Sequence, residues 1–389
     1  MIRVAFFAHL AFHRPIVQPI MEALGTRCRC LLSDDRRAIV AFDPDVLVMT
    51  SHACLEYFRH HLPRALAVNV RHGMIGKAIV HRLPRRSSAR RFDFVCVGAE
   101  ARIESYARAQ AEPGAYWLTG YPQLDPLFRR DPPPRLPLDP RAKTVLYAPT
   151  WNLGLSSAGM LGARLVELIR AEAPGVNVII KPHPVIGEWR PEWMACWERL
   201  AAAGPGVHLV RDTHADVTAY MLAADALISD ASSTVFEFLA LDRPIILITN
   251  SLHRADPAYE AEDIIWRWRD VGEEVRDPAA LPGAVARALG DPGARGDWRK
   301  HYAGILFGAL TDGRNHERVA ERILAVGAER ARAERRPAQA PVIPTAPVWL
   351  WHDLKTRLLS SAPIRRILMR RFEAMRLRAR SRKLGPSGP

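Results

Sequence analysis

The segment from Asp225 to Thr249, DALISDASSTVFEFLALDRPIILIT, predicts a strand, a tight turn, a helix and a second strand. The first apolar run ends on Asp230, and Pro244 opens the second. Between them, Ser232 and Ser233 begin an amphipathic segment. Backbone N–H groups at a helix start lack intrahelical partners, and the helix dipole makes that end electropositive. Open α/β sheets bind ligands at the carboxyl ends of their strands, so this turn is a candidate phosphate site, although a lone serine pair is more often a helix cap.

Composition limits the class of protein. The chain has 389 residues, of which 48% are apolar, so we expect two folded domains. The net charge is +14, and the residues from Leu350 to Pro389 contribute +9 of it. The main body is therefore only mildly basic, which argues against a nucleic-acid-binding groove in it.

Several other features are absent from the sequence. The five cysteines form no CxxC pair, which favours a reduced, cytosolic chain. The N-terminus begins a strand almost at once and lacks the pattern of a signal peptide. No apolar run approaches the roughly 18–20 residues of a membrane-spanning helix. Metal-binding patterns such as HExxH are missing, so we expect no metal. A Walker loop and a GxGxxG motif are also missing, which disfavours a P-loop NTPase and a dinucleotide oxidoreductase.

Apolar runs alternate with helix-like segments in two blocks, which is typical of parallel sheets. The runs of the first block are Val4–Phe7, Cys28–Leu32, Val46–Met49, Leu66–Val70, Phe94–Val97 and Tyr116–Leu118. The runs of the second block are Val145–Tyr147, Val178–Ile180, His208–Val210, Ala226–Ile228 and Ile245–Ile248. Helical patterns lie between several of them, at 14–24, 101–110, 163–171, 192–202 and 216–223, and a last helix is expected from His316 to about Arg330.

Proline-rich stretches divide the chain. RRDPPPRLPLDPRAK, residues 129–143, contains five prolines and cannot continue a helix or strand. We therefore predict a Rossmann-like acceptor-side domain at 1–128, a linker at 129–143, a Rossmann-like donor domain at 144–335, and a Pro/Ala linker with a basic helical tail at 336–389. Two doubly wound α/β domains joined in this way predict the GT-B arrangement, in which the domains face each other across a cleft.

Two histidines follow strand ends in patterns that suit anion handling. His72 stands in NVRHGMIGK, where Gly73 permits close backbone approach and Lys77 adds a cation. His183 stands in KPHP, where two prolines restrict the backbone and Lys181 can neutralise a phosphate. Rigid presentation suits general acid–base chemistry, although a strand-end histidine is often structural and one in a rigid turn can simply face solvent.

Three further polar residues accompany these turns. Thr150 follows the apolar run VLYAP. Glu237 lies one turn into the helix after Ser233, where it can reach a ribose hydroxyl or merely interact with the helix dipole. Asp312 belongs to a DG pair before the last helix and is either a ligand residue or part of an ordinary turn.

The motifs VLYAPTWN, KPHP, DALISDASSTVFEFLALDRPIILI and DGRNHERVAERI, in this order, resemble the CDP-glycerol glycerophosphotransferase family of teichoic-acid and capsule assembly. RHGMIGK and LTGYPQLDPLF resemble two upstream segments of that family, so the resemblance covers about residues 65–330. It implies a GT-B fold and the transfer of glycerol phosphate from CDP-glycerol to a hydroxyl acceptor, with release of CMP. CDP-glycerol is then a substrate, and no cofactor is expected.

The resemblance also implies roles for single residues. His72 matches a histidine treated as catalytic and as the base, and His183 matches one that is needed for turnover and lies close to the diphosphate. Lys77 and Arg71 fall on the acceptor side. The donor side comprises the residues expected around the diphosphate and ribose: Thr150, Lys181, Asp230, Ser232, Ser233, Glu237 and Asp312.

Residues 348–384 combine tryptophans, arginines and two apolar helical faces. This pattern is typical of an interfacial helix on anionic lipid, where each basic residue near the surface contributes about 1 kcal/mol. We therefore predict a cytoplasmic protein that is peripheral on the inner face of the cell membrane. Its predicted partners are a nucleotide-activated donor, a lipid-linked or glycan acceptor and anionic lipid, with no nucleic acid. A charged helix packed on the protein's own body, or an RNA-binding arm, would give the same pattern.

Two other functions fit the same architecture. One is a GT-B glycosyltransferase that uses another nucleotide-activated donor, and it would prefer a nucleotide other than cytidine. The other is a non-catalytic binding protein that keeps the fold, and it would bind nucleotide without releasing CMP.

Overall fold

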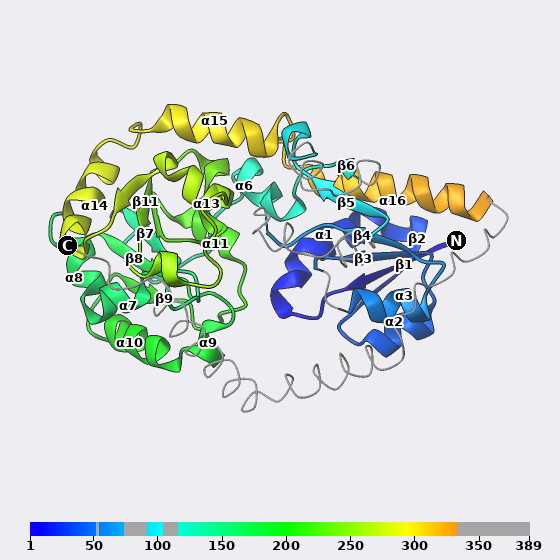
Figure 1. The fold of residues 1–389 in the computed structure, drawn as a ribbon, viewed down its shortest axis with the longest axis horizontal. Helices are drawn as coiled ribbons and strands as arrows, with labels where there is room; N and C mark the ends of the chain where they lie inside the picture. The colour runs from blue at the N-terminus through cyan, green and yellow to red at the C-terminus, as the bar shows by residue number, and fades with distance from the viewer. Residues whose placement is uncertain (52–53, 74–91, 104–115, 333–389) are drawn as a thin grey trace. The chain divides into compact units, whose positions relative to one another are not determined.

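The computed structural model describes residues 1–51, 54–73, 92–103 and 116–332, which form two compact units (Figure 1). Unit 1 comprises Met1–Asp131 together with the segment that begins at Ala303. Unit 2 comprises Pro132–Tyr302. The first crossing between the units therefore falls inside the predicted linker, and the chain leaves unit 2 within α15 (Gly296–Phe307).

Unit 1 is built on a six-stranded sheet with the order β2-β1-β3-β4-β5-β6, in which every pairing is parallel. Its strands are β1 (Ile2–Phe7), β2 (Cys28–Ser33), β3 (Val46–Met49), β4 (Leu66–Asn69), β5 (Phe94–Val97) and β6 (Tyr116–Leu118). Its helices include α1 (Arg14–Leu24), α2 (Arg36–Phe42), α3 (Leu55–His61), α6 (Asp125–Arg129) and α16 (Asn315–Arg332). The strand order reverses between β1 and β3, which creates a switch point at their carboxyl ends.

Helices cover both faces of this sheet, because successive strand residues point to opposite sides. Val4 and Phe6 of β1 belong to a core that includes residues of α1 and α16. Ala5 and Phe7 belong to a second core, which includes residues of α2 and α3. In Figure 1 these two helix pairs lie on opposite sides of the first sheet. Strand β3 and most of β1 are apolar runs without polar alternation because both of their faces are buried, whereas β2 at the edge of the sheet exposes Arg29.

Unit 2 repeats this design with the order β12-β11-β10-β7-β8-β9, again with parallel pairings. Its strands are β7 (Thr144–Tyr147), β8 (Asn177–Ile180), β9 (Val207–Leu209), β10 (Ala226–Ser229), β11 (Ile245–Ile248) and β12 (Glu273–Val275). Its helices are α7 (Ala158–Leu161), α8 (Leu165–Arg170), α9 (Ile186–Trp189), α10 (Pro191–Ala202), α11 (Val217–Ala223), α12 (Thr234–Phe238), α13 (Ile264–Arg267), α14 (Leu281–Gly290) and the first part of α15. The order reverses between β7 and β10, so the switch point of unit 2 lies there.

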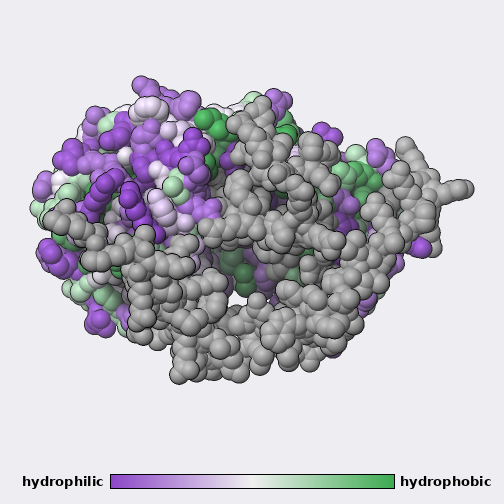
Figure 2. All heavy atoms as spheres, in the orientation of Figure 1, coloured by the Kyte–Doolittle hydropathy of each residue, from purple (hydrophilic) through white to green (hydrophobic). Residues whose placement is uncertain are grey.

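The surface of the described residues is mostly polar. Figure 2 shows hydrophilic residues over much of the visible face of unit 2. Exposed large apolar side chains are few, and the most exposed after Met1 are Leu252 at 54% and Trp298 at 47%. Within the described ranges, no helix combines the length and the apolar content needed to cross a bilayer.

The predicted strands are confirmed, with β9 displaced by one residue, and β12 is an additional strand. The predicted helix at 101–110 is described only as far as residue 103, and its remainder lies outside the described residues.

The last helix belongs to a different unit from the one the sequence suggests. The sequence places it in a domain at 144–335, whereas in the structure α16 packs on α1 and groups with unit 1. Val319, Ala320 and Ile323 lie in the same buried core as β1. The apolar face of α16 therefore completes a buried core on one face of the first sheet, although α16 follows unit 2 in the sequence.

A buried carboxylate fixes the start of α16. Asp125 is 2% exposed and accepts hydrogen bonds from the backbone N–H groups of Asn315 (3.0 Å) and His316 (2.9 Å), and its carboxylate lies 2.6 Å from Nδ1 of His316. Gly120, which has a φ of +79°, approaches Asn315 so closely that a Cβ would collide with it. The segments LTGYPQLDPLF and DGRNHERVAERI thus meet within unit 1, and their contact is a helix cap.

Replacing Asp125 with alanine is expected to destabilise α16 by about 1–3 kcal/mol, because its first N–H groups lose a charged, buried acceptor. Hydrogen exchange measured by mass spectrometry should show faster exchange in the first turns of α16 and unchanged rates in β7 and β10. Arg322→Ala, at an exposed position of the same helix, is the control. Wild-type protection of α16 in the Asp125 variant would show that another group caps the helix.

Candidate active site

Asp230 ties together the two loops at the switch point of unit 2. Its carboxylate accepts hydrogen bonds from the backbone N–H of Thr150, after β7, and from the N–H and hydroxyl of Ser157, all at 2.8 Å. Burial raises the pKa of this carboxyl to about 6, although the same hydrogen bonds and Arg269 oppose the shift. The carboxylate therefore shapes the loops after β7 and β10 from inside the protein.

Arg269 also links these segments through hydrogen bonds, and the sequence analysis missed it. Its side chain is 11% exposed and donates to the backbone oxygen of Asp230 (3.3 Å), to Thr249 Oγ1 (2.7 Å) and to Glu274 Oε1 (3.2 Å). Burial lowers the pKa of its guanidinium, and Glu274 opposes that shift. One buried cation thus joins β10, β11 and β12. Nothing in the sequence WRWRD distinguishes Arg269 from its neighbouring arginine.

The turn after β10 contains Ser232 and Ser233 and is called the serine turn. Hydrogen bonds between Ser232 and Thr234 help to hold it. Helix α12 begins at Thr234 and continues as a 3-10 turn to Leu241, so the predicted helix is confirmed in a short form. Ser232 Oγ accepts hydrogen bonds from the N–H of Thr234 (3.4 Å) and from its hydroxyl (3.0 Å). Ser233, at the N-cap, makes no side-chain cap bond. The pair therefore does not act as a simple side-chain cap at the N-cap position itself.

Glu237 lies on α12 and is buried. Burial raises the pKa of its carboxyl to about 7, and the nearby Asp216 adds to this shift, whereas a hydrogen bond with Ser233 lowers the pKa. The carboxyl is thus coupled to the serine turn through Ser233.

The KPHP turn follows β8 and is held by Lys181. The ammonium group donates to the backbone oxygens of Pro182 (3.0 Å) and Thr213 (2.8 Å), and the residue is 4% exposed. Burial lowers the pKa of Lys181 to about 8, with Asp212 and Asp216 opposing the shift. In this structure Lys181 thus fixes the backbone of the turn, and its predicted contact with phosphate stays a prediction.

His183 presents its ring at this turn. Its Nδ1 accepts a hydrogen bond from the backbone N–H of Val185, at 3.4 Å. A neutral imidazole that accepts at Nδ1 carries its proton on Nε2. The ring lies near Trp151, with centroids 6.3 Å apart, and Trp151 in turn packs edge-on against Trp189 at 4.7 Å. His183 therefore has the tautomer of a hydrogen-bond donor at Nε2.

His72 has the opposite tautomer. It is exposed, follows β4 in unit 1, and its Nδ1 lies 2.9 Å from the backbone oxygen of Thr50. A carbonyl oxygen can only accept, so Nδ1 carries the proton and Nε2 carries the lone pair. The preceding Arg71 has a φ of +55°, a left-handed conformation that costs roughly 1–2 kcal/mol in a non-glycine residue. Such strain concentrates at functional sites. Lys77 lies outside the described residues.

The aromatic rings of Phe12 and His13, from the loop after β1, lie next to His72. The ring of His13 lies 5.2 Å from it and that of Phe12 lies 6.1 Å from it, measured between centroids. His9 contacts His13 at 4.7 Å. The sequence HLAFH contains these residues, but it lies between the predicted strand Val4–Phe7 and the predicted helix 14–24, and it gave no signal of a site.

Asp312 belongs to unit 1, whereas the other predicted donor-side residues belong to unit 2. Its carboxylate accepts from the N–H of Arg314 (3.1 Å) and pairs with Arg318 at 2.6 Å. The pairing with Arg318 lowers the pKa of Asp312 to about 2. These contacts are those of a turn that precedes α16.

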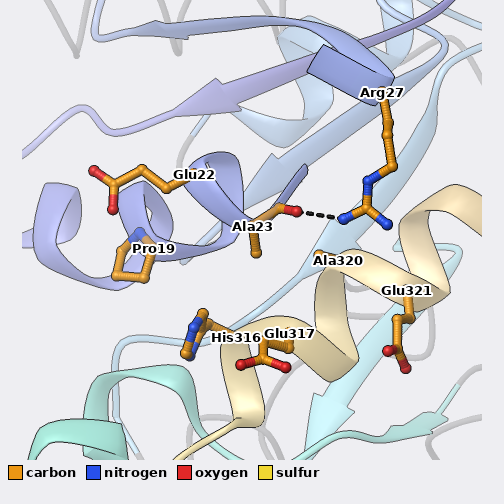
Figure 3. A pocket seen from close by; sticks show the side chains of 8 residues that line it. All are labelled: Pro19, Glu22, Ala23, Arg27, His316, Glu317, Ala320 and Glu321. Carbon is orange, nitrogen blue, oxygen red and sulfur yellow. Dashed lines mark hydrogen bonds between the residues drawn. The ribbon is translucent and has the colours of Figure 1, made fainter. Parts of the chain in front are cut away.

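A hollow of about 440 Å³ lies elsewhere in unit 1, between α1 and α16 (Figure 3). It is lined by Glu22, Glu317 and Glu321 among others, and the guanidinium of Arg27 there donates to the oxygen of Ala23. None of the predicted site residues lines it. Over the described part of the chain, no group of three or more His, Cys, Asp or Glu side chains is arranged to hold a metal ion.

Two Rossmann-like units with polar loops at their switch points define the GT-B class of folds, and solved structures share this fold. The wall teichoic acid polymerase TagF is 14% identical, with a TM-score of 0.64, and the match covers 85% of this chain and 90% of that chain. A putative UDP-N-acetylglucosamine 2-epimerase from Listeria monocytogenes is 13% identical with a TM-score of 0.58, covering 86% and 98%. MnaA from S. aureus, in complex with UDP, is 10% identical with a TM-score of 0.58, covering 83% and 96%.

Sequence comparison identifies the family. A comparison with curated proteins finds no significant match. The model of the CDP-Glycerol:Poly(glycerophosphate) glycerophosphotransferase family matches residues 36–325, a range that contains every predicted site residue. The chain belongs to this family, and it is therefore an enzyme of the glycerophosphotransferase type.

Replacing Glu237 with glutamine tests the effect of burying this carboxyl. Its pKa in the fold, about 7, lies above the ordinary value of 4.5, so the carboxyl costs stability progressively as pH rises from 4.5 to about 7. Glutamine is neutral at every pH. The variant should therefore be more stable than wild type at about pH 8, by about 1.4 kcal/mol for each pKa unit, and the difference should vanish at about pH 4.

Thermal unfolding at several pH values checks this expectation. Glu167→Gln, at an exposed position of the same unit, is the matched control and should show no such pH dependence. A difference in stability between Glu237→Gln and wild type that stays constant with pH would contradict the raised pKa.

Proposed function

We propose that this enzyme transfers glycerol phosphate from CDP-glycerol to a hydroxyl group of a lipid-linked or glycan acceptor and releases CMP. The product would be a cell-surface polymer of the teichoic-acid or capsule type. Family membership supports the donor, and TagF, which shares the fold, is a wall teichoic acid polymerase of which one structure was obtained after a soak with CDPG. The observation that carries the proposed chemistry is the backbone partner of each Nδ1, a carbonyl oxygen at His72 and an N–H at His183, which implies opposite tautomers.

These tautomers suit two different roles in a phosphoryl transfer: a base at the attacking hydroxyl and a hydrogen-bond donor at the phosphate. In the proposed reaction, the acceptor oxygen forms a bond to the phosphorus that bears glycerol, and the bond from that phosphorus to the oxygen of CMP breaks. His72 Nε2, which carries a lone pair, takes the proton of the attacking hydroxyl. His183 Nε2–H donates to the phosphate oxygens as negative charge moves onto CMP. General acid–base catalysis of this kind contributes about 10²–10⁴-fold to the rate.

The switch point of unit 2 supports the donor side of the proposal. Phosphoryl transfer depends mainly on positioning and charge neutralisation. Asp230 and Arg269 fix the loops after β7 and β10, which carry Thr150, Ser232 and Ser233. We assign the donor diphosphate to these loops and to Lys181 and His183 at the adjacent strand β8. The proposal needs no cofactor besides the donor substrate.

Replacing His72 or His183 with alanine tests these roles. Each change should reduce CMP release from CDP-glycerol by about 10²-fold or more. Calorimetry should show wild-type affinity for CDP-glycerol in His72→Ala and weaker affinity in His183→Ala, because only His183 is assigned to the donor. His61→Ala, at an exposed position of α3, is the control. Wild-type turnover in both variants would refute the proposed chemistry.

The same titrations separate the alternatives. A glycosyltransferase with another donor is the second candidate, since MnaA was solved with UDP and shares the fold. Tighter binding of UDP or GDP than of CMP by the wild-type protein would favour it. Nucleotide binding without CMP release, across a panel of lipid-linked and glycan acceptors, would favour a non-catalytic binding protein.

We also propose that the enzyme acts at the cytoplasmic face of the membrane through its basic segment 348–384, whose structure lies outside the described residues. The support is its sequence, in which basic residues are interleaved with apolar residues, including Trp349 and Trp351. A shortened protein that ends at Arg335 should co-sediment with anionic vesicles less than the full chain, because each basic residue near the surface contributes about 1 kcal/mol. Equal co-sedimentation would remove the segment from the proposal.

A further inference from the structure

His13 is a buried imidazole without a hydrogen-bond partner. It lies in the 3-10 turn Ala11–His13 between β1 and α1 and is 1% exposed. Neither ring nitrogen has a hydrogen-bond partner among the described residues. Burial, with smaller contributions from the nearby His9 and His72, lowers the pKa of His13 to about 3, so the ring is neutral. One N–H donor and one lone pair are therefore unused, whereas buried polar groups are normally paired.

A second unpaired polar atom lies in the same place. Thr50 follows β3 and is 2% exposed, and its Oγ1 also has no partner among the described residues. The backbone oxygen of this same residue accepts the hydrogen bond from His72 Nδ1. The ring of His13 in turn packs against that of His72, with centroids 5.2 Å apart. Both unpaired groups therefore belong to residues that contact the proposed base, His72.

The position in the fold is that of a ligand site. His13, Thr50 and His72 follow β1, β3 and β4, which are neighbours in the sheet of unit 1. The switch point between β1 and β3 is where open α/β sheets bind ligands. A phenylalanine or leucine would fill the place of His13 without leaving polar atoms unpaired. The fold alone therefore does not account for a histidine here.

We propose that His13 and Thr50 bind the hydroxyl-bearing end of the acceptor, a polyol or polyol phosphate, beside His72. A polyol carries hydroxyls on adjacent carbons, and each can both donate and accept. One hydroxyl can pair with the imidazole of His13 and the next with the hydroxyl of Thr50. The rings of the half-buried Phe12 and the exposed His72 pack against that of His13, so these two side chains move aside when the acceptor reaches His13 and Thr50. This inference rests on the proposed function and names the acceptor-side residues that the function requires.

The neutral state of His13 is consistent with this role. A second imidazolium next to His72 would repel the proton that the base must take up. A neutral ring supplies a donor and an acceptor without that charge. Asparagine and glutamine side chains offer the same pair of groups, which provides a conservative replacement for the test.

The test compares His13→Phe with His13→Gln. The probes are glycerol 3-phosphate for the acceptor side and CMP for the donor side, each titrated separately and followed by NMR. His13→Phe should weaken binding of glycerol 3-phosphate at least tenfold and leave CMP affinity unchanged, while His13→Gln should stay within about threefold of wild type. The melting temperature of His13→Phe should not fall, because the fold loses no hydrogen bond.

Two further variants complete the design. Thr50→Val keeps the shape of the side chain, removes the unpaired hydroxyl and should also weaken binding of glycerol 3-phosphate. It serves as the main variant if His13→Phe does not fold. His61→Phe changes a histidine at the end of α3, which leads into the amino end of β4, and should leave both affinities unchanged.

The outcomes separate this inference from the proposed function. Wild-type affinity for glycerol 3-phosphate in both His13→Phe and Thr50→Val overturns the inference, as does an equal loss of CMP affinity. A wild-type protein that binds CMP but not glycerol 3-phosphate also overturns it, while the donor half of the proposed function stands. A wild-type protein that binds neither probe overturns the proposed function and the inference with it.

Discussion

The hydrogen bonds of the Asp230 carboxylate are the constraint on which the site of unit 2 depends. They join the loop after β7 to the loop after β10, the two strands between which the strand order reverses. A carboxylate in this place is costly, as its raised pKa shows, and it is retained because few other groups accept from two backbone N–H groups and a hydroxyl at once. Arg269 reinforces the tie from the other side through the backbone oxygen of the same residue. Preorganised loops of this kind are what phosphoryl transfer needs.

Backbone contacts also determine which tautomer each of the two histidines adopts. A carbonyl oxygen faces Nδ1 of His72, and an N–H faces Nδ1 of His183, so the same side chain becomes a lone-pair carrier in one place and a donor in the other. The difference follows from which backbone group each strand end presents to the ring.

The fold was largely predictable because most strands, such as β3, β7, β8, β10 and β11, are buried on both faces, so they read as apolar runs between helical patterns. Strand β12 was not predicted because it is short and two of its three residues are glutamates. The periodicity of α16 indicates that one face is buried, but it cannot indicate which sheet buries it. Sequence motifs correctly placed His72, His183 and Asp230 at strand ends, whereas their roles in a site stay predictions. Arg269 and His13 could not be found, because their significance depends on burial and on partners distant in the chain.

The return of the chain to unit 1 has a consequence for the order of events during synthesis. Val319 and Ile323 belong to the core that also contains residues of β1, although more than three hundred residues separate them in sequence. The first sheet therefore leaves the ribosome without the helix that covers part of one of its faces. Unit 2, whose described strands and covering helices are contiguous in the chain, can reach its final packing first. The nascent N-terminal half then has an uncovered apolar surface until α16 has been synthesised, which is the interval in which a chaperone would be of most use to this enzyme.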